Sequence, residues 1–160
     1  MDKYDPNEWT ERFVRLNRNF CIRFLLQTNE EVLTFVKGGK YKVAIAGLDR
    51  MMNGMIVMHN ARLGNFKPFI CGLSFIEGDI IACALNDAPD NKRRDIALKA
   101  FMDAYDYSTG GLAEFASEAI QLLQQGIDFS DFKNTFDPNF PDESIFGILT
   151  TNRTHLSDML

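Results

Sequence analysis

The stretch from Lys40 to Gly64, KYKVAIAGLDRMMNGMIVMHNARLG, constrains the fold more than any other part of the chain. Its apolar side chains recur at steps of three and four residues: Ala44, Leu48, Met51, Met55 and Met58. That spacing is typical of one face of an α-helix. Gly64 comes just past the cationic Arg62, and glycine after such a last turn is a common helix end. We therefore predict a long central helix whose methionines fill a core.

A second interpretation places antiparallel hairpins in the same region. β-Branched residues alternate with others on both sides of Gly38-Gly39, and two glycines between alternating runs are a hairpin signal. The segment PFICGLSFIEGDIIACAL, which begins at Pro68, has helical spacing but contains two glycines. The alternative fold is therefore α+β, with hairpins around residues 31–46 and 68–85. We prefer the all-α class, a compact bundle of five to seven helices, because its start and stop signals agree along the chain.

Other helices are predicted around the central one. Asp5-Pro6 has the residue types that cap and open a first helix, and Asn29 is a candidate cap for a short helix that ends at Gly38. A later helix is predicted over residues 91–107, with its basic residues Lys92, Arg93, Arg94 and Lys99 mostly solvated. The cleanest apolar face in the chain predicts a further helix over residues 112–125.

Basic and acidic residues are distributed unevenly along the 160-residue chain. Residues 1–100 carry 15 basic and 12 acidic residues, whereas residues 101–160 carry 2 and 10, and the whole chain has a net charge of −5. An acidic C-terminal third argues against general nucleic-acid binding. We expect a helical body over residues 1–126 and an acidic, phenylalanine-rich segment over residues 127–160 that packs on the body or docks on a partner.

The C-terminal segment holds the candidate partner-binding residues. Phenylalanines alternate there with acidic side chains, and the candidates are Phe129, Phe132, Phe136, Phe140, Asp131 and Asp137. The first three rings fall on one side of a short helix, after which Pro138 and Pro141 require an extended path. Aromatic anchors carry much of the binding energy where they fill pockets on a partner.

Catalytic and metal-binding signals are weak. The two histidines, His59 and His155, lie far apart, and the spacing of the three cysteines matches no zinc or disulfide framework. Cys71 or Cys83 with His59 supplies the residue types of a cysteine-dependent enzyme, but neither stands at a nucleophile turn. We therefore predict no catalytic residue, metal or cofactor.

Two acidic residues stand out within an otherwise apolar segment. Glu77 and Asp79 are flanked by isoleucine and phenylalanine, and an apolar environment raises the pKa of a carboxyl group. The same pair is equally consistent with the polar edge of an element or with a turn.

Compartment and function follow from these features as expectations. The first residues, MDKYDPNEW, are polar where a secretory signal would be apolar, and no apolar run approaches the length of a membrane span. We expect a cytoplasmic protein with reduced thiols and no membrane association. The first hypothesis is a non-enzymatic protein-binding module, acting as a small regulator, inhibitor or adaptor, whose partner is another protein or a second copy of itself. The alternatives are a helical carrier of a small molecule or lipid and the cysteine-dependent enzyme.

Overall fold

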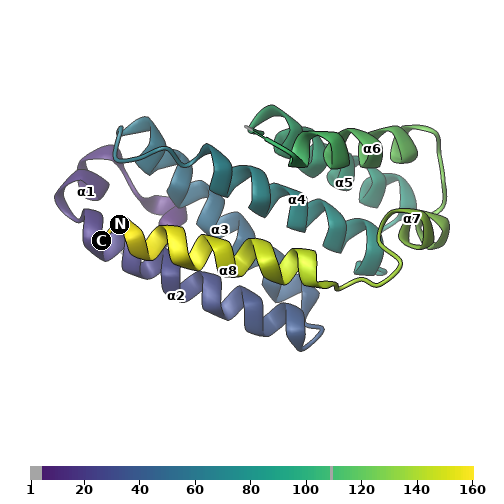
Figure 1. The fold of residues 1–160 in the computed structure, drawn as a ribbon, viewed down its shortest axis with the longest axis horizontal. Coiled ribbons are helices and arrows are strands. Elements are labelled where there is room, and N and C mark those ends of the chain that lie inside the picture. Colours follow the sequence, from purple (N-terminus) through teal and green to yellow (C-terminus); the bar gives the residue numbers. More distant parts are fainter. Residues whose placement is uncertain (1–4, 109) are drawn as a thin grey trace.

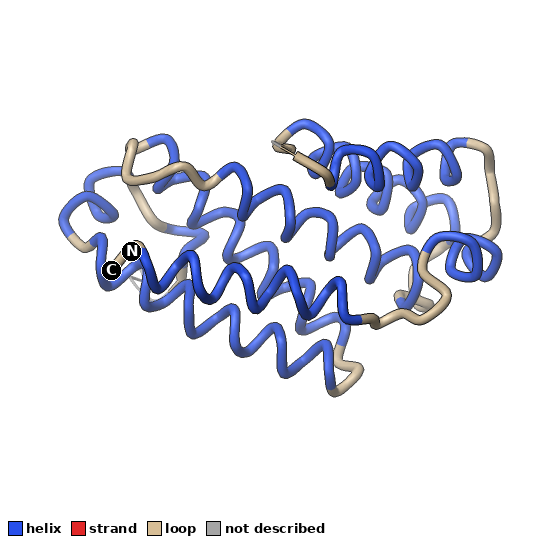
Figure 2. Tube along the Cα trace, viewed as in Figure 1, coloured by secondary structure: helices blue, strands red, loops and turns tan. Residues whose placement is uncertain are grey.

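The computed structural model describes residues 5–108 and 110–160, and within these ranges it contains helices and turns but no β-strand (Figure 2). Residues 1–4, part of the polar start noted above, lie outside this description. The predicted all-α class is confirmed. Both regions considered for hairpins are helical, because α2 (Arg18–Lys37) and α3 (Tyr41–Asn60) cover most of residues 31–46 and α4 (Lys67–Ala84) covers residues 68–84.

Eight α-helices and one 3-10 turn make up the described part of the chain, slightly more than the five to seven expected. The remaining elements are η1 (Pro6–Glu8), α1 (Glu11–Leu16), α5 (Asp90–Asp106), α6 (Leu112–Gln124), α7 (Phe129–Phe136) and α8 (Glu143–Asp158). Asp5 caps only the short turn η1, and α1 begins later with Thr10 as its cap. The extended path enforced by the prolines is confined to the connection between α7 and α8, because Asp142 caps a new helix.

Asn29 does not begin a helix as predicted. It lies in the interior of α2, fully buried, and its side-chain amide donates a hydrogen bond of 2.9 Å to the main-chain carbonyl of Leu149 in α8. The residue type suits a helix cap, but here the amide nitrogen makes a tertiary contact, while the buried Oδ1 has no hydrogen-bond partner among the described residues. α2 therefore continues without a break to Lys37.

α4 lies in the middle of the molecule, between two groups of helices (Figure 1). Five of its side chains belong to a core shared with α2, α3 and α8: Phe69, Ile70, Leu73, Ile76 and Ile80. Phe75, Ile81 and Ala82 belong to a second core shared with α5, α6 and α7. The methionine face of the predicted central helix, which is α3, lies in the first core, where Met51, Met55 and Met58 are fully buried.

Two glycines of α4 mark its closest contacts with other helices. A Cβ atom added at Gly72 would lie 2.8 Å from a methyl carbon of Ile148 in α8, and one added at Gly78 would lie 2.9 Å from the ring of Phe101 in α5. These glycines lower the helix propensity of α4. They also allow Ile148 of α8 and Phe101 of α5 to pack against the backbone of α4 more closely than a side chain at either position would permit. This packing explains why α4 is helical in spite of its glycines.

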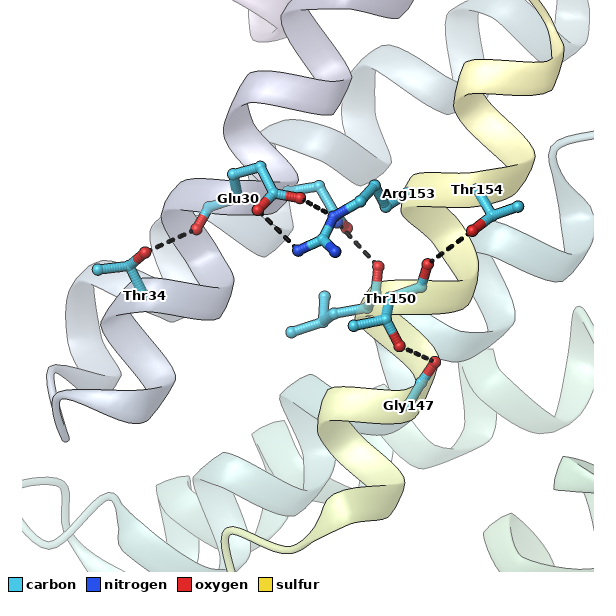
Figure 3. Close-up of polar contacts among 8 residues, drawn as sticks. Glu30, Thr34, Gly147, Thr150, Arg153 and Thr154 are labelled. Atoms are coloured by element: carbon cyan, nitrogen blue, oxygen red, sulfur yellow. Dashed lines mark hydrogen bonds and ion pairs between the residues drawn. The ribbon is translucent and has the colours of Figure 1, made fainter.

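Polar side chains join α2 to α8 along the edge of the first core (Figure 3). Arg153 of α8 forms a two-point ion pair with Glu30 of α2, with Nη2 2.8 Å from Oε2 and Nε bonded to Oε1. Within α8, the Thr150 hydroxyl donates to the carbonyl of Gly147 at 3.1 Å. Because both ion-pair side chains are about half exposed, the pair orients the helices and contributes little to stability.

Arg93 is buried and Arg94 is half-buried, contrary to the prediction of mostly solvated basic residues in α5, whereas Lys92 and Lys99 are exposed as predicted. Arg93 is only 7% exposed and donates to the carbonyls of Ile81 and Ala82 at 2.8 and 2.9 Å. Its guanidinium also lies 3.8 Å from the ring centroid of Phe129. Arg94 donates to carbonyls at the end of α6 and beyond it, at 3.0 and 2.8 Å. Arg93 therefore binds carbonyl groups that the end of α4 leaves without partners, and Arg94 ties the end of α6 to the connection that follows it.

Candidate functional site

A groove follows the seam between α4 and α8, and α6 forms its opposite wall. It consists of two adjacent hollows with volumes of about 290 and 400 Å³. Leu112 of α6 and both Ser144 and Ile148 of α8 line the two hollows in common, so the hollows lie side by side. We call this feature, from Pro68 to Asp79 along α4, the α4 groove.

The larger hollow is open and is lined mostly by small side chains. Pro68 and Gly72 come from α4, and Gly147 and Thr151 come from α8. A Cβ atom added at Gly147 would meet no other atom within 4 Å, so this glycine borders open space. His155 lines the far end, where its ring makes an edge contact with Phe69 at a centroid distance of 6.3 Å.

The smaller hollow is more enclosed and combines aromatic walls with carboxyl groups; we call it the acid chamber. Its aromatic walls are Phe75 of α4, Phe136 of α7 and Phe115 of α6. Phe115 is 56% exposed and therefore forms an unusually apolar rim. The carboxyl groups of Asp79, Asp137 and Asp142 line the same chamber, although they come from α4 and from the two ends of the connection between α7 and α8.

Local structure holds each carboxyl group of the acid chamber in place. Asp79 is 1% exposed and accepts a hydrogen bond of 3.2 Å from the Cys83 thiol one helical turn away. Asp137, 6% exposed, follows the last residue of α7. Asp142 caps α8 by accepting from the main-chain N–H and the hydroxyl of Ser144, at 3.1 and 2.6 Å.

The acid chamber holds a proton at neutral pH. Burial raises the pKa of Asp79 to about 9, and a hydrogen bond to Asp137 together with the negative charge of Asp137 contributes to the rise. Burial also raises the pKa of Asp137. Two carboxyl groups that share a hydrogen bond in an apolar site retain one proton between them, because both cannot ionise cheaply. The chamber can therefore donate a hydrogen bond or, after losing its proton, neutralise a cation.

Glu77 lies half-buried on the side of α4 that approaches Asp49 of α3 and Asp103 of α5. Burial raises its pKa to about 9, and a hydrogen bond to Asp49 and the negative charge of Asp49 add to the effect. Lys99, which pairs with Asp103 at 3.1 Å, partly opposes this rise. The expectation that the apolar environment raises the pKa of both Glu77 and Asp79 is therefore confirmed.

The structure separates the predicted partner-binding residues into three environments. Phe129 and Phe132 are buried in the second core, at 8% and 0% exposure. Phe140 packs against Tyr41 with ring centroids 5.6 Å apart, and Asp131 lies exposed in the first turn of α7. Only Phe136 and Asp137 of this set line the acid chamber.

The groove residues from α6 and α8 were not predicted. Asp142 followed by Ser144 and Ile145 is a helix-start signal, and it would have placed Ile148 on a helix. The prolines before it and the acidic composition concealed that helix.

The cysteines lie in environments that keep their thiols protonated. Cys71 donates to the carbonyl of Ala104 at 3.2 Å, and burial raises its pKa. Burial and the neighbouring Asp79 raise the pKa of Cys83, and burial raises that of Cys21 to about 12. His59 uses Nδ1 to accept a hydrogen bond of 3.2 Å from the main chain of Phe66. A nucleophilic cysteine needs the opposite effect, a lowered pKa, so these contacts do not favour thiol chemistry.

Over residues 5–108 and 110–160, no group of three or more histidine, cysteine, aspartate or glutamate side chains is arranged to hold a metal ion. In the same ranges, no helix has both the length and the apolar character needed to span a membrane. No protein-family model matches the chain, and neither the curated proteins nor the solved structures include a significant match.

Proposed function

We propose that the protein is a non-enzymatic binding module that holds an amphipathic, positively charged helix of another protein in the α4 groove. The observation that carries this proposal is that the groove is open, apolar and bordered by the acidic third of the chain. The walls from α6, α7 and α8 all belong to residues 101–160, which carry 10 acidic and 2 basic residues.

The dimensions of the groove support a helical ligand. Pro68 and Asp79 are eleven residues apart in α4, a distance of about 16 Å at 1.5 Å per residue, or three helical turns. A docked helix binds through side chains at positions i, i+3 or i+4, and i+7, which span about 10 Å, or two turns, and therefore fit within this length. Gly147 borders open space and leaves room for the backbone of this helix to approach, whereas Ile148 fills the space beside Gly72.

Charge supports a basic ligand. Asp79, Asp137 and Asp142 gather at one end of the groove, and Glu143 is exposed in the first turn of α8 beside it. The nearest cation from this third of the chain, Lys133, directs its ammonium group to the carbonyl of Pro138 at 3.3 Å. Opposite charges steer a ligand to its site and select against acidic competitors. The proposal also places the protein in the cytoplasm, because its three free cysteines suit a reducing compartment.

The test uses a fluorescent, amphipathic Leu/Lys peptide of about 15 residues, or four helical turns. Gly147→Leu places a side chain in the larger hollow, and Gly147→Ala is the matched control because the added methyl group meets open space. We expect fluorescence anisotropy to show binding to the parent and to Gly147→Ala, with affinity about tenfold or more weaker for Gly147→Leu.

A Leu/Glu peptide and a Leu/Lys peptide whose leucines follow no helical period serve as ligand controls. The proposal predicts that both bind more weakly than the amphipathic Leu/Lys peptide. Equal binding of the three peptides, or equal binding by the Gly147→Leu variant, would contradict docking in the groove. Sedimentation of the parent protein tests the other predicted partner, a second copy of the chain. A dimer that Gly147→Leu dissociates would show that the groove holds this second copy.

A small apolar molecule is the second candidate ligand, because the acid chamber alone has a volume of about 290 Å³ and aromatic walls. Native mass spectrometry distinguishes the two cases. A purified protein heavier than the 18.2 kDa chain by the mass of a small molecule would favour a carrier, whereas the bare chain mass favours the protein-binding module.

A further inference from the structure

The acid chamber has the composition of a site for a cationic group with an apolar stem. Phe75, Phe136 and Ile148 provide apolar walls, and Asp79 and Asp137 place carboxyl groups against them. An alkylammonium ion has this same division, with a strongly hydrated charged end and a chain of methylene groups. The chamber shares Leu112, Ser144 and Ile148 with the larger hollow, so a helix docked along the α4 groove would lie beside it.

We propose that the acid chamber binds one alkylammonium group, such as the end of a lysine side chain, and that its entry expels a proton from Asp79. In this step the O–H bond of the Asp79 carboxylic acid breaks, and the proton passes to solvent. The carboxylate that remains accepts hydrogen bonds from the incoming –NH₃⁺ group. The charge inside the chamber rises by one with the ammonium ion and falls by one with the proton, so it does not change.

The groups that face Asp79 are consistent with this exchange. Asp137 and Asp142 face it from the two ends of the connection before α8, Cys83 faces it from the next turn of α4, and Lys133 of α7 lies close enough to act on Asp137 and Cys83. Asp137 and Asp142 disfavour a second negative charge until a cation arrives. Lys133 does not line the chamber, and its ammonium group donates to the Pro138 carbonyl, so it lowers the pKa values of Asp137 and Cys83 without occupying the site.

This inference rests on the proposed groove function but is tested with a ligand too small to need the whole groove. The probe is n-hexylammonium, and n-hexanol is its neutral counterpart. Isothermal titration calorimetry in buffers of different ionisation enthalpy counts the protons released on binding. We expect about one proton released per hexylammonium bound at pH 7, and affinity that rises by up to about tenfold per pH unit below pH 9. Hexanol should bind more weakly and release no proton.

Asp79→Asn keeps the shape of the side chain and removes the titrating group. We expect the variant to release no proton and to lose its preference for hexylammonium over hexanol, while a thermal melt shows that it stays folded. Asp137→Asn is a second variant should Asp79→Asn unfold. Hexylammonium that binds no better than hexanol, or proton release that survives in both variants, would overturn the proposal.

Gly147→Leu separates this proposal from the groove function. Gly147 borders the larger hollow and not the acid chamber. The variant should therefore bind hexylammonium as the parent does, even where it no longer binds the helical peptide. Peptide binding without amine binding would refute only the ammonium site, and amine binding without peptide binding would refute only the docking of a helix.

Discussion

Replacing Arg93 with methionine removes a guanidinium that joins three helices. Arg93 extends from α5, donates to two carbonyls in the last turn of α4 and covers the ring of Phe129 in α7. Ile81 and Ala82 lie among the last four residues of α4, whose carbonyls have no partner within the helix. Methionine keeps an unbranched apolar stem of similar length, so the change isolates the polar head.

The magnitude follows from the contacts that are lost. Hydrogen bonds that involve a charged group contribute about 1.5–3 kcal/mol each, and a cation over an aromatic ring contributes about 0.5–2 kcal/mol. Both carbonyls would be left buried without a partner. Allowing for some relaxation, we expect Arg93→Met to lower the free energy of unfolding by about 3–5 kcal/mol, a large share of the 5–15 kcal/mol typical of a folded domain.

Urea unfolding followed by circular dichroism at 222 nm measures this loss. With a slope of about 2 kcal/mol per molar urea, a loss of 4 kcal/mol lowers the midpoint by about 2 M. Lys92→Met is the matched control, because Lys92 is the exposed neighbour and its loss should change stability by less than about 0.5 kcal/mol. A loss below about 1 kcal/mol for Arg93→Met would mean that water satisfies the carbonyls, and the reasoning would fail.

Four other changes have predicted outcomes. Gly147→Ala should raise the free energy of unfolding by about 0.5–1 kcal/mol through its higher helix propensity, because its added methyl group meets open space. The midpoint of thermal unfolding should rise accordingly. Gly78→Ala should lower the same midpoint, because its Cβ would lie 2.9 Å from the ring of Phe101. Truncation after Gly126 removes α7 and α8, which contribute to both cores, and should abolish cooperative unfolding; a sharp transition would contradict this. Asp79→Asn should stabilise the protein increasingly from pH 5 to pH 9 in urea titrations, because the raised pKa of Asp79 means that the folded state binds a proton which the unfolded state has released. A constant difference between variant and parent across this range would refute that assignment.

Periodicity predicted the elements whose burial is regular. The methionine face of α3 and the apolar face of α6 were identified because their side chains repeat every three or four residues. α4 was harder to assign, because it is buried on nearly all sides and its two glycines serve contacts with Ile148 and Phe101 that sequence spacing does not reveal. α8 was missed because its buried residues include Asn152, which interrupts the apolar pattern between Leu149 and Leu156.

The candidate site depends on contacts that no local pattern contains. Asp79 and Asp137 are 58 positions apart in the sequence, yet they share a hydrogen bond. The apolar flanks of Asp79 were sufficient to predict the direction of its pKa change but not its partner. Arg93 shows the same limit, because the run of basic residues around it is typical of a solvated face until the end of α4 is placed beside it.

The position of α4 in both cores has a consequence for native-state hydrogen exchange. Its amides should be among the slowest to exchange, because α4 stays packed on one core while the other opens. α6 contributes only to the second core, so it can detach in a partial opening that leaves α2, α3 and α8 intact. Such an opening removes one wall of the α4 groove. The lifetime of a bound ligand would then be limited by the rate at which α6 detaches, and not by the strength of the contacts on α4 alone.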